Sequence, residues 1–350
     1  MSPLRLLLEK KIRTNGPLKI SAFMELCLFH PHHGYYKNSL PLGKTGDFIT
    51  APEISQLFGE IIGLYFVDQW QKMASPLCLN FIEFGPGNGT LLRDIMRIFQ
   101  KFSLLKKTRF FLLEINPLLI QKQKELCLPL SRECQWFDDI SSLLKALPLH
   151  LTFFVGNEFL DVFPIDQYIF KGKRWWERRI GIESDHFIIK EVLCEDSILP
   201  FPKNPSPNAI FEISSQQKDF FQKLLLGLKE LSFSGLFIDY GYEEGQGDSL
   251  QAVSHHSFSN IFDKIGEQDL TAHVNFKYLK DLSVQILPHL HDQNIFPQGP
   301  FLKNLGIDIR AQMLIQSNPK LKKIFEEALF RLTDSSQMGS LFKIFKLHNP

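Results

Sequence analysis

The stretch that decides the fold is Phe81-Ile-Glu-Phe-Gly-Pro-Gly-Asn-Gly-Thr90. It begins as a short apolar run interrupted by one acid, Glu83, and continues into three alternating glycines: Gly85, Gly87 and Gly89. Apolar residues at helical spacing follow from Leu91 to Met96. The stretch therefore predicts a strand, a tight turn and the start of a helix, an arrangement that lets backbone approach a bound molecule closely.

The residues after this turn alternate between strand-like and helix-like patterns. Strands are predicted over 79–84, 109–115, 134–137, 149–155 and 235–240, and helices over 91–102, 117–126 and 214–231. Such alternation indicates parallel strands joined by right-handed crossovers. We expect an α/β fold, a Rossmann-like and mostly parallel sheet with helices on both faces.

The chain divides into four predicted segments around this sheet. Residues 1–78 form an N-terminal helical region that contributes to the ligand pocket, and residues 79–241 form the Rossmann-like core. Turn residues at 171–173 and 183–185 predict an antiparallel hairpin insertion near 165–193. Residues 242–337, rich in loops and short helices, are predicted as a second insertion, and 338–350 supply a closing strand over about 340–346.

The residues Thr50-Ala-Pro-Glu53 have the form of a capping box, with glutamate three positions after threonine. Apolar residues from Ile54 to Tyr65 then follow the spacing of one helix face. The pattern predicts one helix that begins at this box.

Composition narrows the setting. The 350 residues carry a formal net charge of +1, which gives no broad electrostatic basis for binding nucleic acid or an anionic membrane. The five cysteines form no C-x-x-C pair, and neither a signal peptide nor an apolar run long enough to span a bilayer is evident. The cluster His30-Pro-His32-His33 fits no standard ligand spacing, so no metal is expected. These features predict a cytoplasmic protein.

The spacing of the glycines bears on the ligand. A dinucleotide fingerprint reads G-x-G-x-x-G, but here the spacing is G-x-G-x-G, and Thr90 stands at the position of the third glycine. Glu83 would repel a phosphate, whereas it suits a ligand with an ammonium or sulfonium charge. S-adenosylmethionine (SAM) carries both charges and has no phosphate, which makes a nicotinamide cofactor the weaker alternative.

Acids also stand at the ends of the next two predicted strands. Glu114 follows the second strand and could accept the ribose hydroxyls, while Asp138 follows the third and could face the adenine. The carboxyl ends of parallel strands meet at one sheet edge, so these two side chains and Glu83 are expected there together. The alternative is a turn required only for packing, with surface acids at the strand ends.

Several segments, in order along nearly the whole chain, resemble the MidA/NDUFAF7 family of SAM-dependent protein-arginine methyltransferases, within the class I methyltransferases. The matching segments are 46–60, 83–91, 157–161, 238–241, 266–274 and 338–343. The resemblance implies a class I methyltransferase fold, SAM as methyl donor, and S-adenosylhomocysteine as product. It also places Thr50 and Pro52 against the cofactor, beside Glu83, the three glycines, Thr90, Glu114 and Asp138.

The segment Asn157-Glu-Phe-Leu-Asp161 follows the predicted strand 149–155, where class I methyltransferases commonly bind the methyl acceptor. Arginine pairs with carboxylates through its planar fork of donors. Glu158 and Asp161 would orient the guanidinium and help take up the released proton, and Asn157 could bind the cofactor. The alternative for this trio is a turn whose polar side chains cap the next helix.

The resemblance implies a protein partner, with a subunit of respiratory complex I as the family's mitochondrial substrate and an assembly role. Since the sequence shows no transit peptide, the chain resembles a bacterial member with a cytoplasmic location, for which the mitochondrial matrix would be the organellar equivalent. The resemblance also implies that the insertion 242–337 lies on the substrate side, and it suggests substrate-side roles for His255, His256, His273 and Asp269. Methylation of a small molecule or RNA, or a SAM-binding assembly factor without turnover, remain alternatives. The basic and aromatic run 171–179 is ordinary for a hairpin with one solvated face. The sequence leaves the oligomeric state open, with a homodimer as one option.

Overall fold

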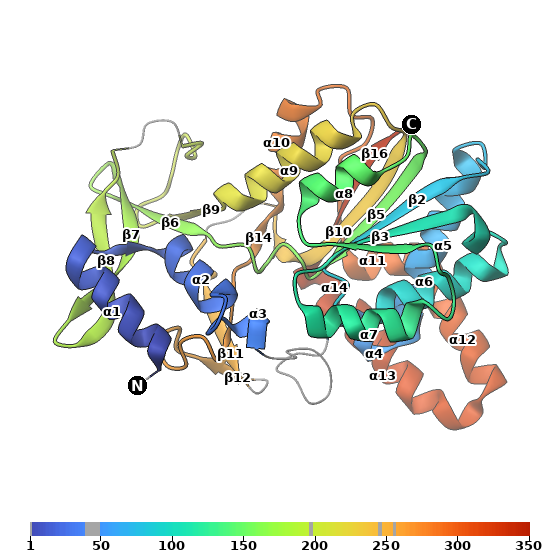
Figure 1. Ribbon diagram of the computed structural model, residues 1–350, viewed down its shortest axis with the longest axis horizontal. Coiled ribbons are helices and arrows are strands. Elements are labelled where there is room, and N and C mark those ends of the chain that lie inside the picture. Colours follow the sequence, from blue (N-terminus) through green and yellow to red (C-terminus); the bar gives the residue numbers. More distant parts are fainter. Residues whose placement is uncertain (1, 39–49, 196–198, 244–246, 255–256) are drawn as a thin grey trace. The chain divides into compact units, whose positions relative to one another are not determined.

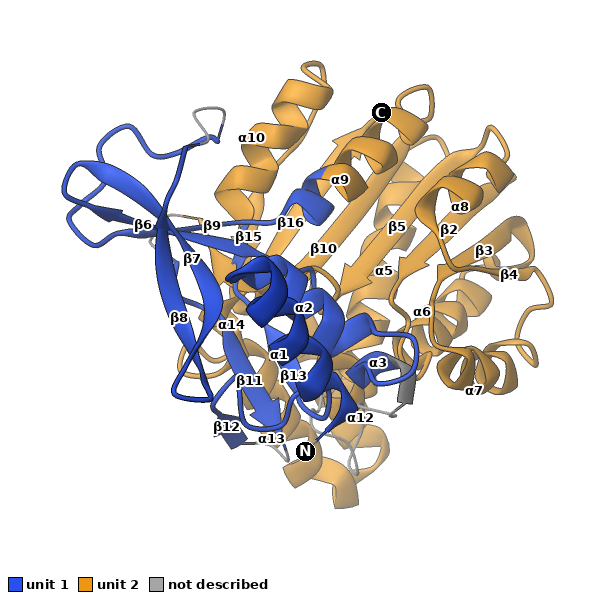
Figure 2. Cartoon of the chain, turned by 60° about the vertical axis from the view of Figure 1, so that its left-hand side comes forward, with its two compact units in different colours: residues 1–41, 161–218, 244–275 blue, residues 42–160, 219–243, 276–350 orange. Residues whose placement is uncertain are grey.

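The computed structural model describes residues 2–38, 50–195, 199–243, 247–254 and 257–350. The chain forms two compact units, each built from three separate segments (Figure 2). Unit 1 contains Met1–Pro41, Asp161–Lys218 and Glu244–Asn275, and unit 2 contains Leu42–Leu160, Asp219–Glu243 and Phe276–Pro350. These units divide the chain at other places than the four segments predicted from the sequence, because the described residues 50–78 pack with the core and the hairpin insertion packs with the N-terminus.

Unit 2 is organised around a sheet in the order β15-β16-β10-β5-β2-β3-β4. Its strands are β2 (Leu79–Phe84), β3 (Thr108–Leu113), β4 (Cys134–Phe137), β5 (Leu151–Asn157), β10 (Phe233–Tyr242), β15 (Ile295–Pro297) and β16 (Phe342–Asn349). The strands from β10 to β4 are parallel, and β16 and β15 join antiparallel. The predicted α/β fold with a mostly parallel sheet is confirmed, and so is the closing strand, which begins at Phe342 after a short helix.

The helices of unit 2 lie on both faces of this sheet (Figure 1). They are α4 (Ala51–Ile54), α5 (Gln56–Lys72), α6 (Thr90–Lys101), α7 (Pro117–Cys127), α8 (Ile140–Ala146), α9 (Ser215–Leu228, in this unit from Asp219), α10 (Phe276–Ile286), α11 (Gln298–Asn304), α12 (Ile307–Ser317), α13 (Lys322–Thr333) and α14 (Met338–Leu341). Two short 3-10 helices, Leu105–Lys107 and Pro319–Leu321, complete them.

Strand alternation sends successive side chains of β2 to opposite faces. Phe81 packs in the core formed with α5 and α6. Phe84 stacks instead on Phe237 and meets the ring of Phe220 from α9. Since β2 is buried along its whole length, both faces of the sheet are covered, as a parallel sheet requires.

The strand order also locates the ligand edge. From β2 the chain proceeds outward through β3 to β4, and then returns to place β5 on the other side of β2. The connections therefore reverse direction between β2 and β5. In open parallel sheets, ligands bind beyond the carboxyl ends of the strands at such a reversal. The glycine turn follows β2 and Glu158 follows β5, so both lie at this position.

Unit 1 contains the antiparallel insertion. Its helices are α1 (Pro3–Asn15), α2 (Ile20–Phe29) and α3 (Tyr35–Asn38). One sheet has the order β1-β7-β6-β9 with β8 on β7, from strands β1 (Leu18–Lys19), β6 (Asp166–Lys171), β7 (Arg174–Glu183), β8 (His186–Leu193) and β9 (Ile210–Ile213). A second has the order β12-β11-β13, from β11 (Gln251–Ser254), β12 (Ser257–Ser259) and β13 (Asp269–Thr271), and the two-residue strand Val274–Asn275 (β14) ends the unit.

The hairpin insertion predicted near 165–193 is confirmed with its turns. Gly172 and Lys173 join β6 to β7, and Ser184 and Asp185 join β7 to β8. All four have positive φ angles of 46° to 64°. Two successive residues with positive φ form the type of turn whose twist matches an antiparallel hairpin.

The capping box predicted at Thr50 is wrong. Thr50 stands at the N-cap of α4, but within the described part of the chain its side chain makes no capping bond. The helix is only four residues long, because Ser55 is extended and begins α5 anew by accepting the N–H of Leu57 at 3.2 Å. The carboxylate of Glu53 bonds a different segment.

Candidate functional site

The three glycines of the turn all have left-handed backbone. Their φ angles are 62° at Gly85, 55° at Gly87 and 80° at Gly89, a region that side chains disfavour. A Cβ atom on Gly85 would also lie 2.9 Å from the Phe159 ring. The glycines are therefore required by conformation and, at Gly85, by space.

The turn forms one wall of a pocket of about 50 Å³ in unit 2. Residues from three segments line it: Thr50, Pro52, Glu53, Glu83, Gly85, Pro86, Gly87, Asn88, Thr90, Leu91, Asn157 and Glu158. Within this described lining there are three carboxylates, those of Glu53, Glu83 and Glu158, and no lysine or arginine. The lining favours a cationic ligand and disfavours a phosphate. The structure thus brings together Thr50, Pro52, Glu83, Gly85, Gly87, Thr90, Asn157 and Glu158 of the predicted site residues.

Glu83 lines this pocket and has 3% of its surface exposed. Its Oε2 atom has no hydrogen-bond partner among the described residues. Burial, and secondarily the nearby Glu114, raises the pKa of Glu83 to about 8. A buried carboxylate with an unsatisfied oxygen is what a cationic ligand group would satisfy.

Glu114 is held at the end of β3 by three donors. Its Oε1 atom accepts the N–H groups of Ile115 and Asn116, each at 2.9 Å, and its Oε2 atom accepts the Gln123 amide at 3.1 Å. Burial raises the pKa of Glu114 from its ordinary value, and these hydrogen bonds oppose that rise. Glu114 is therefore fixed in one orientation beside the turn, although it does not line the pocket itself.

Gln123 was not predicted from the sequence. Its side chain is fully buried on α7 and donates to the Gly87 carbonyl at 2.8 Å as well as to Glu114. Its own carbonyl accepts the indole N–H of Trp136 at 2.8 Å. One amide thus joins the glycine turn, the end of β3 and β4. A lone glutamine within a helix carries no motif that would have revealed this.

The third predicted acid, Asp138, is exposed after β4. Its neighbour Asp139 is instead the N-cap of α8 and accepts the N–H groups of Ser141 and Ser142. Asp138 stays a predicted adenine contact. Gly89 makes the left-handed start of α6 and lies outside the pocket lining.

The loop after β5 holds Glu158 in an unusual conformation. Its φ is 51°, and its N–H donates to the Ile238 carbonyl at 2.8 Å. The Oε1 atom accepts two bonds of 3.1 Å, from the Asn157 amide and from the Ala51 N–H. Left-handed backbone is costly for glutamate, and such strain gathers at functional sites.

Asp239 supports the same loop and was not singled out as a site residue. It is almost fully buried, and its carboxylate accepts the N–H groups of Leu160 at 2.8 Å and Tyr240 at 2.9 Å. The acid in Ile238-Asp-Tyr-Gly241, directly after an apolar strand, is the signal that could have identified it.

Asp161, the third member of the predicted trio, belongs to unit 1. It is buried, and its carbonyl accepts the Ala272 N–H at 3.0 Å. Also in unit 1, the Tyr36 hydroxyl donates to Asp269 at 2.9 Å, and burial, then Asp269 and Asp161, raise the pKa of Tyr36. Burial lowers the pKa of His273 in the same unit. His255 and His256 lie outside the described residues.

The histidine cluster of unit 1 is built by local contacts. The Nδ1 atom of His30 accepts the backbone N–H groups of His32 and His33 at 3.3 and 3.2 Å. In the described part of the chain, no group of three or more histidine, cysteine or acidic side chains is arranged to hold a metal ion. Nor is any helix described there long and apolar enough to cross a bilayer.

Comparison with protein families gives a match over residues 61–289. The matching family is described as "Putative S-adenosyl-L-methionine-dependent methyltransferase". The matched range contains the glycine turn, Glu114, Asp138 and the loop after β5.

Curated relatives match almost the entire chain. The protein arginine methyltransferase NDUFAF7, mitochondrial, of Danio rerio is 30% identical over 98% of this chain and 86% of its own. The protein of the same name from Xenopus tropicalis is 30% identical over 96% of this chain and 84% of its own. The protein of this name from Rattus norvegicus is 28% identical over 99% of this chain and 84% of its own.

Among solved structures, a protein of Burkholderia thailandensis bound to S-adenosyl-homocysteine aligns with a TM-score of 0.82. It is 22% identical, and the alignment covers 99% of this chain and 92% of the other. A native crystal structure of a protein from the same organism aligns with a TM-score of 0.81. At this identity the likeness establishes the fold over nearly the full length.

Proposed function

Because this chain belongs to the family of S-adenosyl-L-methionine-dependent methyltransferases, we propose that it transfers the methyl group of SAM to an arginine side chain of a partner protein. The relatives that match over almost its full length are named protein arginine methyltransferases. Their names supply the acceptor class, while the chemistry of the loop after β5 supplies the physical support for it.

The observation that carries the proposal is the set of carboxylates around the glycine turn. Glu53, Glu83 and Glu158 line the described pocket without a basic side chain, and one oxygen of the buried Glu83 has no partner among the described residues. The methionine part of SAM bears an ammonium and a sulfonium, so its charge suits this lining. A dinucleotide would place a pyrophosphate against the same acids.

The residues present fit the nucleoside end as well. Glu114 is oriented by its backbone and Gln123 donors at the end of the neighbouring strand, where a carboxylate can accept ribose hydroxyls. We assign Glu83, Gly85, Gly87, Gly89, Thr90, Thr50 and Pro52 to the methionine and turn side, and Glu114 and Asp138 to the nucleoside. When bound, SAM supplies an electrophilic methyl carbon on its sulfonium.

The chain's contribution to the acceptor lies in the loop after β5. A guanidinium is protonated in water and pairs with carboxylates through a planar fork of donors. Glu158, oriented by Asn157 and by the Ala51 N–H, would hold the guanidinium in line with the donor and draw positive charge from the attacking nitrogen. Asp161 is proposed as the second carboxylate, and the proton released with methylation passes to one of the two.

The partner and compartment are part of the proposal. The family resemblance suggests a subunit of respiratory complex I as the substrate, in an assembly role. The relatives are named mitochondrial, and a bacterial cytoplasmic location for this chain stays a prediction. Proteomic comparison of arginine methylation in cells with and without the gene would identify the acceptor. Methylated RNA or a small molecule, with no change in protein arginine, would contradict the proposal.

The substitution Glu158→Gln tests the role of the acceptor carboxylate. Glutamine keeps a carbonyl oxygen for the Ala51 N–H but loses the charge, so we expect SAM affinity within about threefold of wild type and at least a hundredfold loss of arginine methylation. Calorimetry with SAM, S-adenosylhomocysteine and NAD measures the first, and mass spectrometry of methylarginine the second. Normal turnover in the variant would show that Glu158 does not have this role. Binding of NAD without binding of SAM would contradict SAM as the methyl donor.

The control is Glu327→Gln. Glu327 has 67% of its side-chain surface exposed on α13 and pairs only loosely with Lys323, at 3.7 Å. The control removes one negative charge from unit 2 without touching the pocket. Its affinity and turnover should match those of wild type.

A further inference from the structure

Two loops at the pocket precede a pair of tightly packed helices. The segment Thr50–Ser55 leads into α5, and the glycine turn leads into α6. A Cβ atom on Gly59 of α5 would lie 2.7 Å from the Asp94 Cβ of α6, and one on Gly63 would lie 3.0 Å from the Ile98 Cβ. Because α5 and α6 approach each other this closely, their first residues lie side by side, and so do the two loops that precede them.

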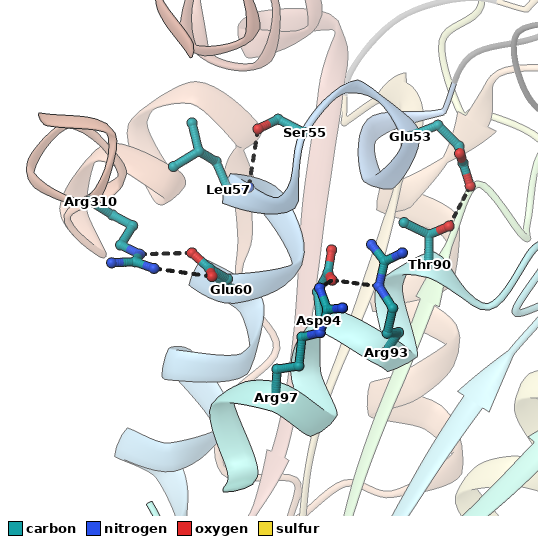
Figure 3. Close-up of polar contacts among 9 residues, drawn as sticks. All are labelled: Glu53, Ser55, Leu57, Glu60, Thr90, Arg93, Asp94, Arg97 and Arg310. Carbon is teal, nitrogen blue, oxygen red and sulfur yellow. Dashed lines mark hydrogen bonds and ion pairs between the residues drawn. The ribbon is translucent and has the colours of Figure 1, made fainter. Parts of the chain in front are cut away.

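Glu53 joins the two loops directly (Figure 3). Its Oε1 atom accepts the Thr90 hydroxyl at 2.6 Å and lies 3.4 Å from the Asn88 amide nitrogen. Thr90 is the first residue of α6, after the left-handed Gly89, so this carboxylate holds the end of the glycine turn. A hydrogen bond to a charged acceptor is stronger than a neutral one.

The same short helix also reaches the loop after β5. Ala51, two residues before Glu53, donates its N–H to the Glu158 Oε1 atom at 3.1 Å. That carboxylate extends from a backbone at a φ of 51°, so neighbouring contacts must maintain its position. α4 therefore contacts the glycine turn through a side chain and the Glu158 carboxylate through its backbone.

We propose that Glu53 is a positioning residue that couples the glycine turn to Glu158: by anchoring α4 on Thr90, it places the Ala51 N–H where it orients the Glu158 carboxylate. The assignment rests on the proposed function, because it gives Glu158 the acceptor role. Glu53 acts through Thr90 and Ala51, and its effect belongs to turnover more than to the affinity for SAM.

The test compares the turnover number and the SAM affinity of full-length variants. Glu53→Ala removes the anchor and one negative charge of the pocket, so we expect kcat at saturating SAM to fall about tenfold or more, and the affinity for SAM to fall by a smaller factor. Glu53→Gln removes the same charge but keeps an acceptor oxygen for the Thr90 hydroxyl, so it should share the change in SAM affinity and yet restore a large part of kcat. Thr90→Val removes the same bond from the other side, and the double variant should be no slower than the slower single variant.

The outcomes separate the two proposals. A Glu53→Ala protein that loses SAM affinity with unchanged kcat would make Glu53 a cofactor ligand and overturn the coupling. Unchanged kinetics, or additive losses in the double variant, would overturn it as well. A wild-type protein without SAM binding or arginine methylation would contradict the proposed function itself. Glu327→Gln again serves as the charge control, and should behave as wild type.

Discussion

At the scale of single residues, Glu83 shows how one position in a motif defines the ligand. A carboxylate inside the protein beside Glu114 resists ionisation, which is why its pKa lies near 8. The unliganded pocket therefore holds a neutral Glu83 below that pH. A cationic ligand favours the ionised form, so ligand binding and loss of a proton are linked.

SAM binding should consequently depend on pH. Between about pH 6 and pH 8, we expect up to one proton to be released per SAM bound, and the affinity to rise by up to about tenfold per pH unit before levelling above pH 8. Calorimetry in buffers with different ionisation enthalpies measures the proton count. An affinity that is flat over this range would contradict the linkage.

Glu83→Gln is the matched variant, because it keeps the shape but cannot titrate. This variant should bind SAM more weakly, and its SAM binding should not release the proton that Glu83 releases in wild type.

The stability of the unliganded protein gives a second test of the raised pKa of Glu83. The pKa of Glu83 is raised in the folded state from 4.5, so its favourable contribution is complete below pH 4.5 and is lost as pH rises toward 8. Wild type should therefore lose stability relative to Glu83→Gln across that interval, in the absence of SAM.

At the scale of elements, α7 organises the nucleoside side of the site through a single side chain. Gln123 bonds the Gly87 carbonyl, the Glu114 carboxylate and the Trp136 indole, all from a fully buried position. Each of these contacts lies at a different strand end or turn. A helix that packs beside the turn can thus fix the positions of the glycine turn, the end of β3 and β4 relative to one another.

Replacing Gln123 should affect stability and affinity together. Gln123→Leu leaves the buried Gly87 carbonyl, the buried Glu114 carboxylate and the part-buried Trp136 indole without this partner. We expect a loss of about 3 kcal/mol in the free energy of unfolding and at least tenfold weaker SAM binding. Urea denaturation and calorimetry measure the two quantities. Gln121→Leu on the same helix is the control, since Gln121 is exposed and its amide donates to Glu125 at 2.8 Å. If Gln123→Leu lowered the free energy of unfolding but left SAM affinity unchanged, Gln123 would have no role in the cofactor site.

At the scale of the whole molecule, the chain assembles each of its two units from three distant segments. The proposed cofactor contacts nevertheless all fall in unit 2, where the pocket is lined by segments near residues 50, 85 and 157. A ligand that bridges these segments should order them together.

Hydrogen exchange provides the test at this scale. With SAM at about a hundred times its dissociation constant, the stabilisation is about 2.7 kcal/mol, and slower exchange should be concentrated in 50–54, 83–92 and 157–160. S-adenosylhomocysteine should protect the same peptides. Protection that leaves the glycine turn unchanged would place the cofactor elsewhere.

Much of the fold and part of the candidate site followed from local patterns. The parallel sheet was predictable because each strand and helix has its own periodicity, and the hairpin because its turn residues tolerate positive φ. The glycine turn and the acids Glu83 and Glu114 were predictable because parallel strands place their carboxyl ends at one edge. The capping box failed because Glu53 bonds Thr90, a residue distant in the sequence.

The sequence by itself determined the α/β architecture, the turn and the charge that its ligand must carry, since these depend on residues close together in the chain. Only the tertiary structure decided the contacts between distant residues: Gln123 with Glu114 and Trp136, Ala51 with Glu158, and Glu53 with Thr90. It also showed Asp161 to be part of unit 1. No local pattern encodes these pairings, because they arise when buried polar groups find partners in the packed protein.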